Sequence, residues 1–356
     1  MTAIGAFLRG VGLIVSLELK QRVRGVAWYV ILGVFFGLVA VVTVGVWVVT
    51  GTWGGSGGGL FSSVVYFVLL LASLISPALS GNAINGEREG GTLATIQVTT
   101  ITTGQIVIGK WLAAWVASLA LLVVTVPFLA IAVGIGEVSA ATVVSSLAVL
   151  AAELGVLAAL GVGLSGVIRK PLFSVVVTYL TVAALSIGTL IAFAIAGTVT
   201  QVQVTQTTVD FDYSTTTDEG TIAECAPPTT TTYSVPRFDL YWGVLVANPY
   251  VVVADASYGD FTRDGQPNDL FGYIAYGVRQ AQVAPETERF DDYCHLAPGE
   301  YFGQDQPTPE EVLRSGVPSW FIGLSIQAVL AAAALFAAWR LTRTPSGRLA
   351  KGSRIA

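Results

Sequence analysis

One short charged stretch decides how this chain is organised: Asn82-Ala-Ile-Asn-Gly-Glu87-Arg88-Glu89-Gly-Gly-Thr92-Leu93-Ala-Thr-Ile96. It lies between two apolar runs, at 60–81 and 110–134, and each is long enough for a helix to cross a membrane, which takes roughly 20 residues. Charged side chains are costly in the hydrocarbon core, so the stretch must leave the bilayer. It is therefore the one internal loop on its side of the membrane that is large enough for a contact surface.

The composition of the whole chain agrees with a membrane protein. Of its 356 residues, 53% are hydrophobic and 12% are charged, whereas about 25% charged residues are usual in a soluble domain. Six apolar runs are long enough to span a bilayer, at about 26–49, 60–81, 110–134, 140–168, 172–198 and 319–339. We therefore predict an all-α membrane protein with six transmembrane helices, an N-terminal interfacial helix and a large mixed extracellular insertion between helices 5 and 6.

The positions of Lys and Arg predict the orientation. Thirteen of the 18 lie in residues 1–25, between Arg88 and Lys110, at Arg169-Lys170 and in the C-terminal tail. With six spans and an inside N-terminus, all of these regions are cytoplasmic, and the protein is predicted to be a multi-pass protein of the plasma membrane. The predicted order is a cytoplasmic amphipathic helix (1–25), spans 1 to 5 with a coupling loop at 82–110 (26–198), an extracellular domain (199–318), span 6 (319–339) and a basic cytoplasmic tail (340–356).

The N-terminal segment 4–24 is expected to form an amphipathic helix in the membrane interface. Its apolar stripe consists of Phe7, Leu8, Val11, Ile14 and Val15. A simple extension of the first span is the alternative. Small residues at a spacing of four predict close helix packing in a bundle or a dimer; they are Gly33 and Gly37 in the first span and Gly155, Ala159 and Gly163 in the fourth.

The block 199–318 is acidic and holds both cysteines. Residues 201–317 contain 18 acidic and five basic side chains, which opposes binding to nucleic acid. Outside the cell, Cys225 and Cys294 are expected to form a disulfide. A metal site that adds His295 to these cysteines is disfavoured, because no further ligand cluster is evident.

Four segments of this block carry local signals. Residues 202–213 alternate apolar and polar side chains as a strand does, and Pro227-Pro228 with the four threonines that follow predicts a loop or exposed linker. The apolar segment 240–257, interrupted at Asn248-Pro249, predicts a broken re-entrant or interfacial helix against the bundle, with a buried core element of the extracellular domain as the alternative. Thr308-Pro309-Glu310-Glu311 predicts a capping box and a short helix ending near Gly316.

Two apparent nucleotide-binding patterns fail on context. Gly104-Gln-Ile-Val-Ile-Gly109-Lys110 resembles a P-loop, but Trp111 stands where a Ser or Thr must bind Mg²⁺, and no strand precedes it. Gly161-Val-Gly163-Leu-Ser-Gly166 lies inside the fourth apolar run, without a βαβ context. We therefore expect no nucleotide site and no cofactor in this chain.

Glu153 is the only ionisable residue in the middle of a predicted span. A charged side chain at that depth costs about 2.5–3.5 kcal/mol on insertion scales. It either lines a polar pathway or pairs with a partner-subunit group, or it is protonated or hydrogen-bonded between helices.

The loop carries a family resemblance. Asn85-Gly86-Glu87-Arg88-Glu89-Gly90-Gly91-Thr92-Leu93, followed by Gln105-Ile-Val-Ile-Gly109-Lys110, resembles the permease subunits of ABC-2 type transporters. That family has an E-R-x-x-G-T-L stretch after its second span and an I-V-x-G-K stretch at the start of its third. The six spans, the N-terminal helix and Asn248-Pro249 are also similar to its layout.

The resemblance implies a transport subunit that is not itself an enzyme. The segment 84–100 would be a coupling helix docked on a separate ATP-binding subunit, which would hold ATP and Mg²⁺. The implied contact residues are Glu87, Arg88, Glu89, Thr92, Leu93 and Ile96. Two permease chains, identical or different, and two ATPases would form the working unit in the lipid bilayer. It would export a lipid-linked, peptide or drug-like substrate.

A non-transporting membrane receptor or assembly protein, with the acidic block as its binding domain, is the alternative function. The size of that block favours it. An intramembrane enzyme is a weaker third possibility, because the spans contain no paired catalytic groups.

Overall fold

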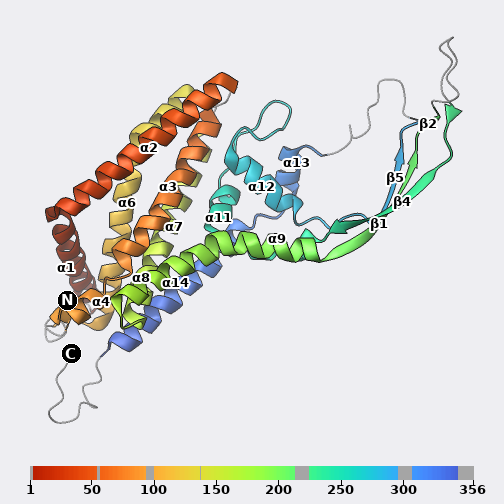
Figure 1. The fold of residues 1–356 in the computed structure, drawn as a ribbon. Helices are drawn as coiled ribbons and strands as arrows, with labels where there is room; N and C mark the ends of the chain where they lie inside the picture. The colour runs from red at the N-terminus through yellow and green to blue at the C-terminus, as the bar shows by residue number, and fades with distance from the viewer. Residues whose placement is uncertain are drawn as a thin grey trace.

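The computed structural model describes residues 3–53, 57–93, 100–136, 138–212, 224–295 and 307–343. Within them, six helical segments are long and apolar enough to cross a membrane: Val26–Val49, Gly57–Glu89, Thr103–Ile135, Ala140–Val167, Pro171–Val199 and Trp320–Thr342. The predicted fold, a mostly helical protein with six spans and a mixed insertion between the last two, is confirmed (Figure 1).

The third span starts earlier than its apolar run suggests. Its helix, α6 (Thr103–Ile135), begins at a capping box in which Thr102 accepts the backbone N–H of Gln105, and the Gln105 side chain accepts the backbone N–H of Thr102. The stretch Gly104–Lys110, which looks like a P-loop, therefore forms the first turns of this helix. The loop predicted at 82–110 therefore ends at Thr102. The helix can start there because its cap satisfies orphan N–H groups.

The N-terminal helix α1 (Ala3–Arg24) is separate from the first span, α2 (Val26–Trp53), and the chain turns at Gly25 between them (Figure 1). Val11 and Ile14 of α1 are buried, and the backbone at Gly109 of α6 lies directly against them. A Cβ atom on Gly109 would lie 2.7 Å from the Ile14 Cβ. The alternative of a simple extension of the first span is therefore wrong.

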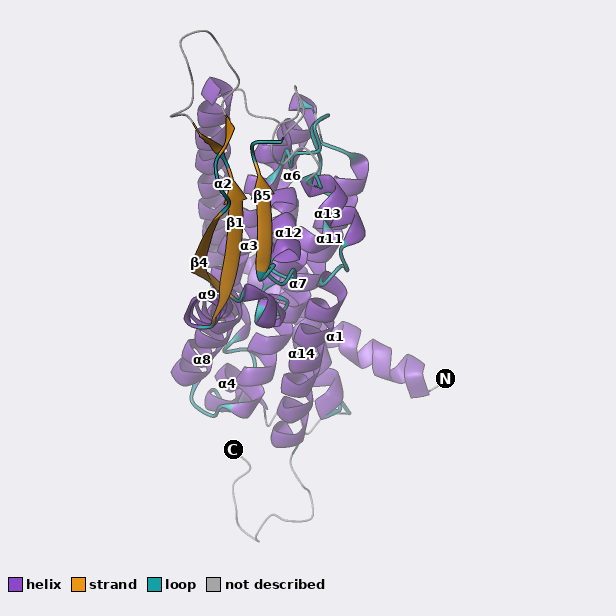
Figure 2. Cartoon of the chain, turned by 90° about the vertical axis from the view of Figure 1, so that its right-hand side faces the viewer, coloured by secondary structure: helices purple, strands orange, loops and turns teal. Residues whose placement is uncertain are grey.

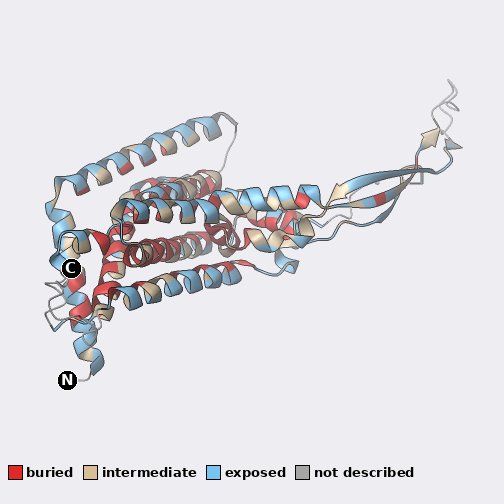
Figure 3. Ribbon diagram, turned by 60° about the horizontal axis from the view of Figure 1, so that its bottom comes forward, coloured by how far each residue is buried: buried red, intermediate tan, exposed pale blue. Residues whose placement is uncertain are grey.

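The centre of the bundle is built from α3 (Gly57–Ser80), α6 and α7 (Ala140–Val167). Figure 3 shows the buried residues concentrated within the helical bundle, whereas the projecting strands are mostly exposed. The helix α2 packs on α3 and α6 but leaves most of its side chains exposed. Such an apolar outer face is suited to lipid.

Glycines bring α7 against its neighbours. A Cβ atom on Gly161 would lie 1.8 Å from the Ser80 Oγ, and one on Gly166 would lie 2.4 Å from the Ala338 Cβ of α14 (Trp320–Thr342). The G-x-G-x-x-G pattern therefore serves close packing of α7 on α3 and α14. In contrast, a Cβ atom at Gly33 or Gly37 would meet nothing within 4 Å in this single chain.

The fifth span is interrupted by one π-helical turn. It consists of α8 (Pro171–Ala183), the π-helix η1 (Ala184–Gly188) and α9 (Thr189–Val199). The Asn248 side chain donates hydrogen bonds to the Ser186 carbonyl oxygen (2.6 Å) and to Thr189 Oγ1 (2.9 Å). A π-turn directs backbone groups out of the regular helical hydrogen-bond ladder. Asn248 of the insertion is therefore held at this irregular turn.

A β-sheet arm projects from the end of α9 (Figures 1 and 2). Its three strands are β1 (Gln201–Val209), β4 (Thr229–Pro236) and β5 (Glu288–Asp292), in the order β4-β1-β5. The strand β1 pairs antiparallel with β4 and parallel with β5. The predicted strand in 202–213 is confirmed for β1. The predicted loop over the four threonines after Pro228 is wrong, because they pair with β1 and β-branched residues suit a strand.

At the tip of the arm, β2 (Phe211–Asp212) pairs with β3 (Glu224–Cys225). The disulfide between Cys225 and Cys294 joins this small sheet to the end of β5. The predicted disulfide is thus present in the structure.

Short helices connect the arm to the bundle. They are the 3₁₀-helix η3 (Phe238–Leu240), α10 (Trp242–Leu245), α11 (Pro249–Ala256), α12 (Leu270–Gln280) and α13 (Pro309–Ser315). The break at Asn248-Pro249 and the capping box of Thr308 with Glu311 are both as predicted. The helix α11 is buried among α7, α12 and α14, so it lies against the bundle and also forms the core of the insertion.

Candidate functional site

The charged stretch forms a short helix at one end of the bundle, which we call the α4 end. This helix, α4 (Asn85–Glu89), follows α3 after a turn. Ile84 precedes it and offers no capping side chain. Ser165 of α7 takes that role, because its Oγ accepts the backbone N–H groups of Ile84 (2.9 Å) and Asn85 (3.1 Å). The position of α4 is therefore set by another span.

Lys110 is the central residue of the α4 end. It stands on α6 with 3% of its side chain exposed, and its Nζ lies 2.7 Å from Glu87 Oε1 of α4. The same Nζ contacts the carboxylate of Glu18 on α1. One buried ammonium thus joins three helices. Removing one partner from a buried ion pair costs about 3–5 kcal/mol, so this contact fixes α4 firmly to the bundle.

The helix α1 makes further contacts at the same end. Arg22 donates to the Ala113 carbonyl oxygen of α6 (3.2 Å) and to the Leu79 carbonyl oxygen of α3 (3.4 Å). Burial lowers the pKa of the Arg22 guanidinium, whereas the charge of Glu18 raises it. At the other end of α1, Gln105 donates to the Ala6 and Phe7 carbonyl oxygens. The helix α1 is therefore part of the α4 end.

Arg88 lies across α4 toward α7. Its guanidinium donates to Asn85 Oδ1 and to the Gly166 carbonyl oxygen, each at 3.3 Å. Arg88, which the resemblance assigned to a partner contact, thus also makes contacts inside the chain. Glu87 and Arg88 support α4 in addition to any role toward another protein.

The exposed residues of the stretch form a lip, Glu89–Thr92. Gly91 has a φ of +70°, which a glycine adopts without strain, and the hydroxyl of Thr92 donates to the Glu87 carbonyl oxygen (3.3 Å). Leu93 is buried, at 7% exposure, in a cluster with Ile84 and Ile106. It anchors the lip, so Glu89 and Thr92 are the predicted contact residues that are exposed in the structure. Ile96 lies outside the described residues, as does all of 94–99 in the predicted coupling helix 84–100.

Glu153 is fully buried in the middle of α7, beside Gln327 of α14. Neither of its carboxylate oxygens has a hydrogen-bond partner, and neither has Gln327 Oε1. The Gln327 amide nitrogen instead donates to the Ala247 carbonyl oxygen (3.0 Å). Three acceptor oxygens in one dry place favour a carboxyl group that carries a proton and donates it.

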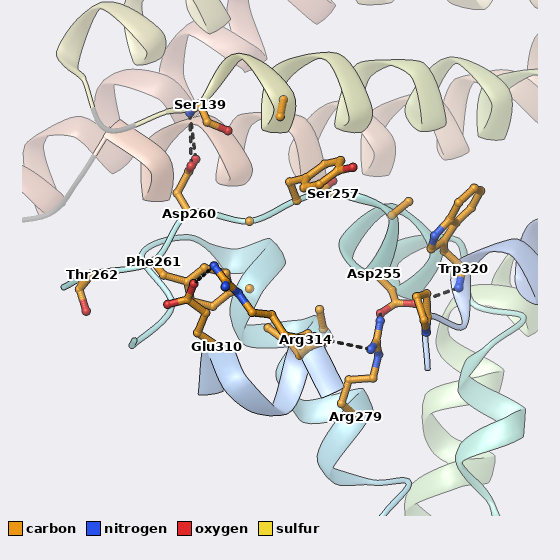
Figure 4. Close-up of a pocket in the computed structure, with 18 residues that line it drawn as sticks. Ser139, Asp255, Ser257, Asp260, Phe261, Thr262, Arg279, Glu310, Arg314 and Trp320 are labelled. Atoms are coloured by element: carbon orange, nitrogen blue, oxygen red, sulfur yellow. Dashed lines mark hydrogen bonds and ion pairs between the residues drawn. The ribbon is translucent and has the colours of Figure 1, made fainter. Parts of the chain in front are cut away.

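A pocket of 840 Å³ lies where the insertion meets the bundle (Figure 4). Asp255 forms its inner wall. One of its carboxylate oxygens accepts from the Arg279 guanidinium (2.6 Å), and the other accepts from Ser319 Oγ (3.0 Å) and the Trp320 N–H (2.9 Å). Asp255 thereby caps α14 and ties it to α12. The remaining acidic groups of this wall are also bonded, Glu310 to Arg314 and Asp260 to the Ser139 N–H. The pocket is a structural junction of the insertion with the last span.

Three important residues escape analysis of the sequence: Lys110, Ser165 and Asp255. The signal for Lys110 was the I-V-x-G-K stretch, which places a lysine near the start of an apolar run. Ser165 lies within the G-x-G-x-x-G pattern of the fourth span, which carries no signal for a helix cap. Asp255 was visible as a lone carboxylate in the apolar segment 240–257, and such a group needs a buried partner. Among the described residues, no cluster of three or more His, Cys, Asp or Glu fits a metal ion.

Residues 11–216 match the family model described as CcmB protein. The match covers more than half of the 356 residues and runs from α1 through the first five spans into the arm. It thus includes α4, Lys110 and Ser165, and it ends before α10 to α14. Among curated proteins, no relative matches the chain.

Proposed function

The chain belongs to the CcmB protein family, and on that basis we propose that it is the permease of an ATP-driven exporter. We propose that the ATPase drives its conformational change through the α4 end. The family makes it a multi-pass membrane subunit of an ABC transporter. The ATPase is a separate partner subunit. We further propose that the ATPase docks on the lip Glu89–Thr92 and that Lys110 transmits its movement to the spans.

The observation that carries the proposal is the contact of Lys110 with both Glu87 and Glu18. A ligand shifts a conformational equilibrium only if it interacts differently with the two states. An ATPase docked on the lip Glu89–Thr92 meets this condition if its movement displaces α4. Because Lys110 joins α4 to α6 and α1, any displacement of α4 carries these two helices with it.

The positions of the basic residues support a topology for the proposed permease. The α4 end, with the basic helix α1, is proposed to face the cytoplasm, and the insertion to lie outside. Two permease chains would then face each other, with the substrate path between them. Open space at Gly33 and Gly37 of α2 offers one surface for such close approach.

The substrate is proposed to be amphipathic, either lipid-linked, a peptide or drug-like. Haem is the substrate class that comes with the family, and it is the second candidate. Haem iron is usually bound axially by His, Met, Cys or Tyr. The chain has one His, one Met, two Cys and 12 Tyr. The His lies in the arm, and the Cys form the disulfide. If haem is the cargo, the spans would hold its apolar faces without a His or Cys ligand to the iron.

Charge reversal on the lip tests the coupling. Because Glu89 is exposed, Glu89→Arg should leave the fold intact, weaken co-purification of the ATPase and reduce substrate-stimulated ATP hydrolysis. Glu286→Arg, an exposed glutamate in the insertion, is the matched control and should behave as wild type. Equal ATPase binding and hydrolysis in the two variants would remove the lip from the docking surface.

The receptor alternative predicts a different result in the same preparation. A receptor or assembly protein would purify without an ATPase, and no ATP turnover would depend on the chain. A stable complex whose ATP hydrolysis requires this chain would exclude it.

A further inference from the structure

The only histidine of the chain lies against its only disulfide. His295 Nε2 is 3.6 Å from Cys225 Sγ, and the other ring nitrogen, Nδ1, is 2.9 Å from Asp292 Oδ2. Cys225 is bonded to Cys294. A carboxylate, an imidazole and a sulfur atom therefore follow one another in hydrogen-bond contact. This order of groups activates sulfur in thiol chemistry, because the imidazole exchanges a proton with the sulfur and the carboxylate orients the imidazole.

The site is open to reagents. The His295 side chain is 69% exposed and that of Asp292 is 30% exposed. Cys225 is an exposed residue, and Cys294, whose sulfur is attacked, is partly exposed. Access of an attacking thiolate is one condition for fast exchange. A disulfide that serves only as a brace has no need of either an exposed sulfur or an adjacent imidazole.

Asp292 is held in place for this role. Its Oδ1 accepts the backbone N–H groups of Cys294 (3.1 Å) and His295 (3.0 Å). The N–H bond from His295 is the main reason why the pKa of Asp292 lies below its ordinary value. The carboxylate is therefore ionised, and its Oδ2 holds the imidazole through Nδ1.

We propose that Cys225, Cys294, His295 and Asp292 form a thiol–disulfide exchange site that accepts two electrons from a dithiol. A thiolate of the dithiol attacks Cys294 Sγ and forms a mixed disulfide. The bond between the two cysteines breaks, and Cys225 leaves with the electron pair. The imidazolium of His295 gives its Nε2 proton to that sulfur. The second thiol of the dithiol loses its proton to solvent and attacks its own partner sulfur. This attack displaces Cys294 as a thiolate, which takes up a proton. The dithiol ends oxidised, and the disulfide of the chain ends reduced.

His295 acts here as the general acid for the leaving sulfur, and Asp292 positions it. The reaction needs neither ATP nor the α4 end, so its test is independent of the proposed transport function.

The test uses the full-length protein in detergent, with dithiothreitol as the dithiol. Reduction is followed by quenching with a polyethylene-glycol maleimide, which adds mass to each free thiol on a gel. General acid catalysis contributes factors of about 10²–10⁴ in enzymes, and His295→Ala is expected to slow reduction at least about tenfold. Rates that agree within twofold would overturn the proposal. Arg314→Ala, which removes another exposed ion pair of the insertion, should keep the wild-type rate.

Asp292→Asn separates positioning from folding. Asn retains an oxygen for the two backbone N–H groups but loses the charge that orients the imidazole. The variant should therefore be reduced more slowly than the wild type, although its unfolding temperature is unchanged. Equal reduction rates would contradict the role of Asp292.

A second measurement avoids the disulfide altogether. In Cys294→Ser, Cys225 is a free thiol beside His295, and in Cys225→Ser, Cys294 is free. Cys225 is expected to react with iodoacetamide at least about tenfold faster than Cys294, because an imidazolium stabilises the reactive thiolate. Equal alkylation rates would overturn the proposal even if both variants fold well.

Discussion

The ammonium group of Lys110 lies 2.7 Å from the carboxylate of Glu87, in a place where only 3% of the lysine side chain meets solvent. This pair joins the start of the third span to the short helix that follows the second. Glu18 of α1 is the other partner of the same ammonium. The charged loop is thus one face of a small rigid body made from three helices.

Lys110→Met should break this body while it preserves much of the side-chain volume. We expect a loss of about 3 kcal/mol in the free energy of unfolding, the low end of the range for a buried pair, because the partly exposed Glu18 and Glu87 then lose their counter-charge. Transport per ATP hydrolysed should also fall. Thermal unfolding in detergent and transport in vesicles measure the two effects. Lys20→Met, at an exposed position of α1, is the control, and equal stability of the two variants would contradict the argument.

Substitutions within α4 should now affect stability as well as coupling. The family resemblance implies only that Glu87 and Arg88 contact the ATP-binding subunit. Since Arg88 donates to the Gly166 carbonyl oxygen of α7, we expect Arg88→Ala to lower the unfolding temperature, and Glu89→Ala to leave it unchanged. The two unfolding curves, recorded side by side, decide this, and identical curves would refute it.

Asp255→Ala should be among the most damaging changes in the insertion. It leaves Arg279 buried without its carboxylate and removes the cap of α14. The expected loss is about 3–5 kcal/mol. Arg314→Ala removes an exposed ion pair instead, for which about 0–1 kcal/mol is usual. Chemical denaturation of both variants gives the comparison, and a small effect at Asp255 would show that the junction tolerates an unpaired arginine.

Asp269 should make the stability of the insertion depend on pH. Burial raises the pKa of this carboxyl group from 3.8 to about 6, although N–H groups of Gly272 and Asp260 donate to it. Between these two values the folded state binds more protons than the unfolded state. The free energy of unfolding therefore falls as the pH rises from about 4 to about 6, by about 3 kcal/mol at most.

Asp269→Asn keeps the cap of α12 but cannot ionise. It should abolish this part of the pH dependence and unfold at a similar temperature at pH 4 and pH 7. Glu286→Gln, at an exposed position, should retain the wild-type profile. A slope that persists in Asp269→Asn must come from another group.

Glu153→Gln should be tolerated, because the amide offers a donor for Gln327 Oε1, which has no hydrogen-bond partner. Glu153→Lys should be strongly destabilising, since it places a charge in a dry site. Expression, unfolding temperature and transport of the two variants test this. If Glu153→Gln folds well but loses transport, the polar-pathway role, which stays a prediction, gains support.

Much of the architecture follows from local patterns in the sequence. The six apolar runs predict the six spans because bilayer thickness sets the helix length. Thr308 with Glu311 predicts the start of α13, and Asn248-Pro249 predicts the break before α11, since caps and proline act within one turn. Two cysteines alone in the outer block predict their own pairing.

The tertiary structure decided what these patterns leave open. The charge of Lys110 is visible in the sequence, but its two partners are 92 and 23 residues away, and only packing brings such distant groups together. The same holds for Asp255 with Arg279, for Ser165 as the cap of α4, and for His295 beside Cys225. Leu93 is buried and Glu89, four residues before it, is exposed. Burial is a property of the surroundings, and no local pattern specifies which neighbours a side chain will meet.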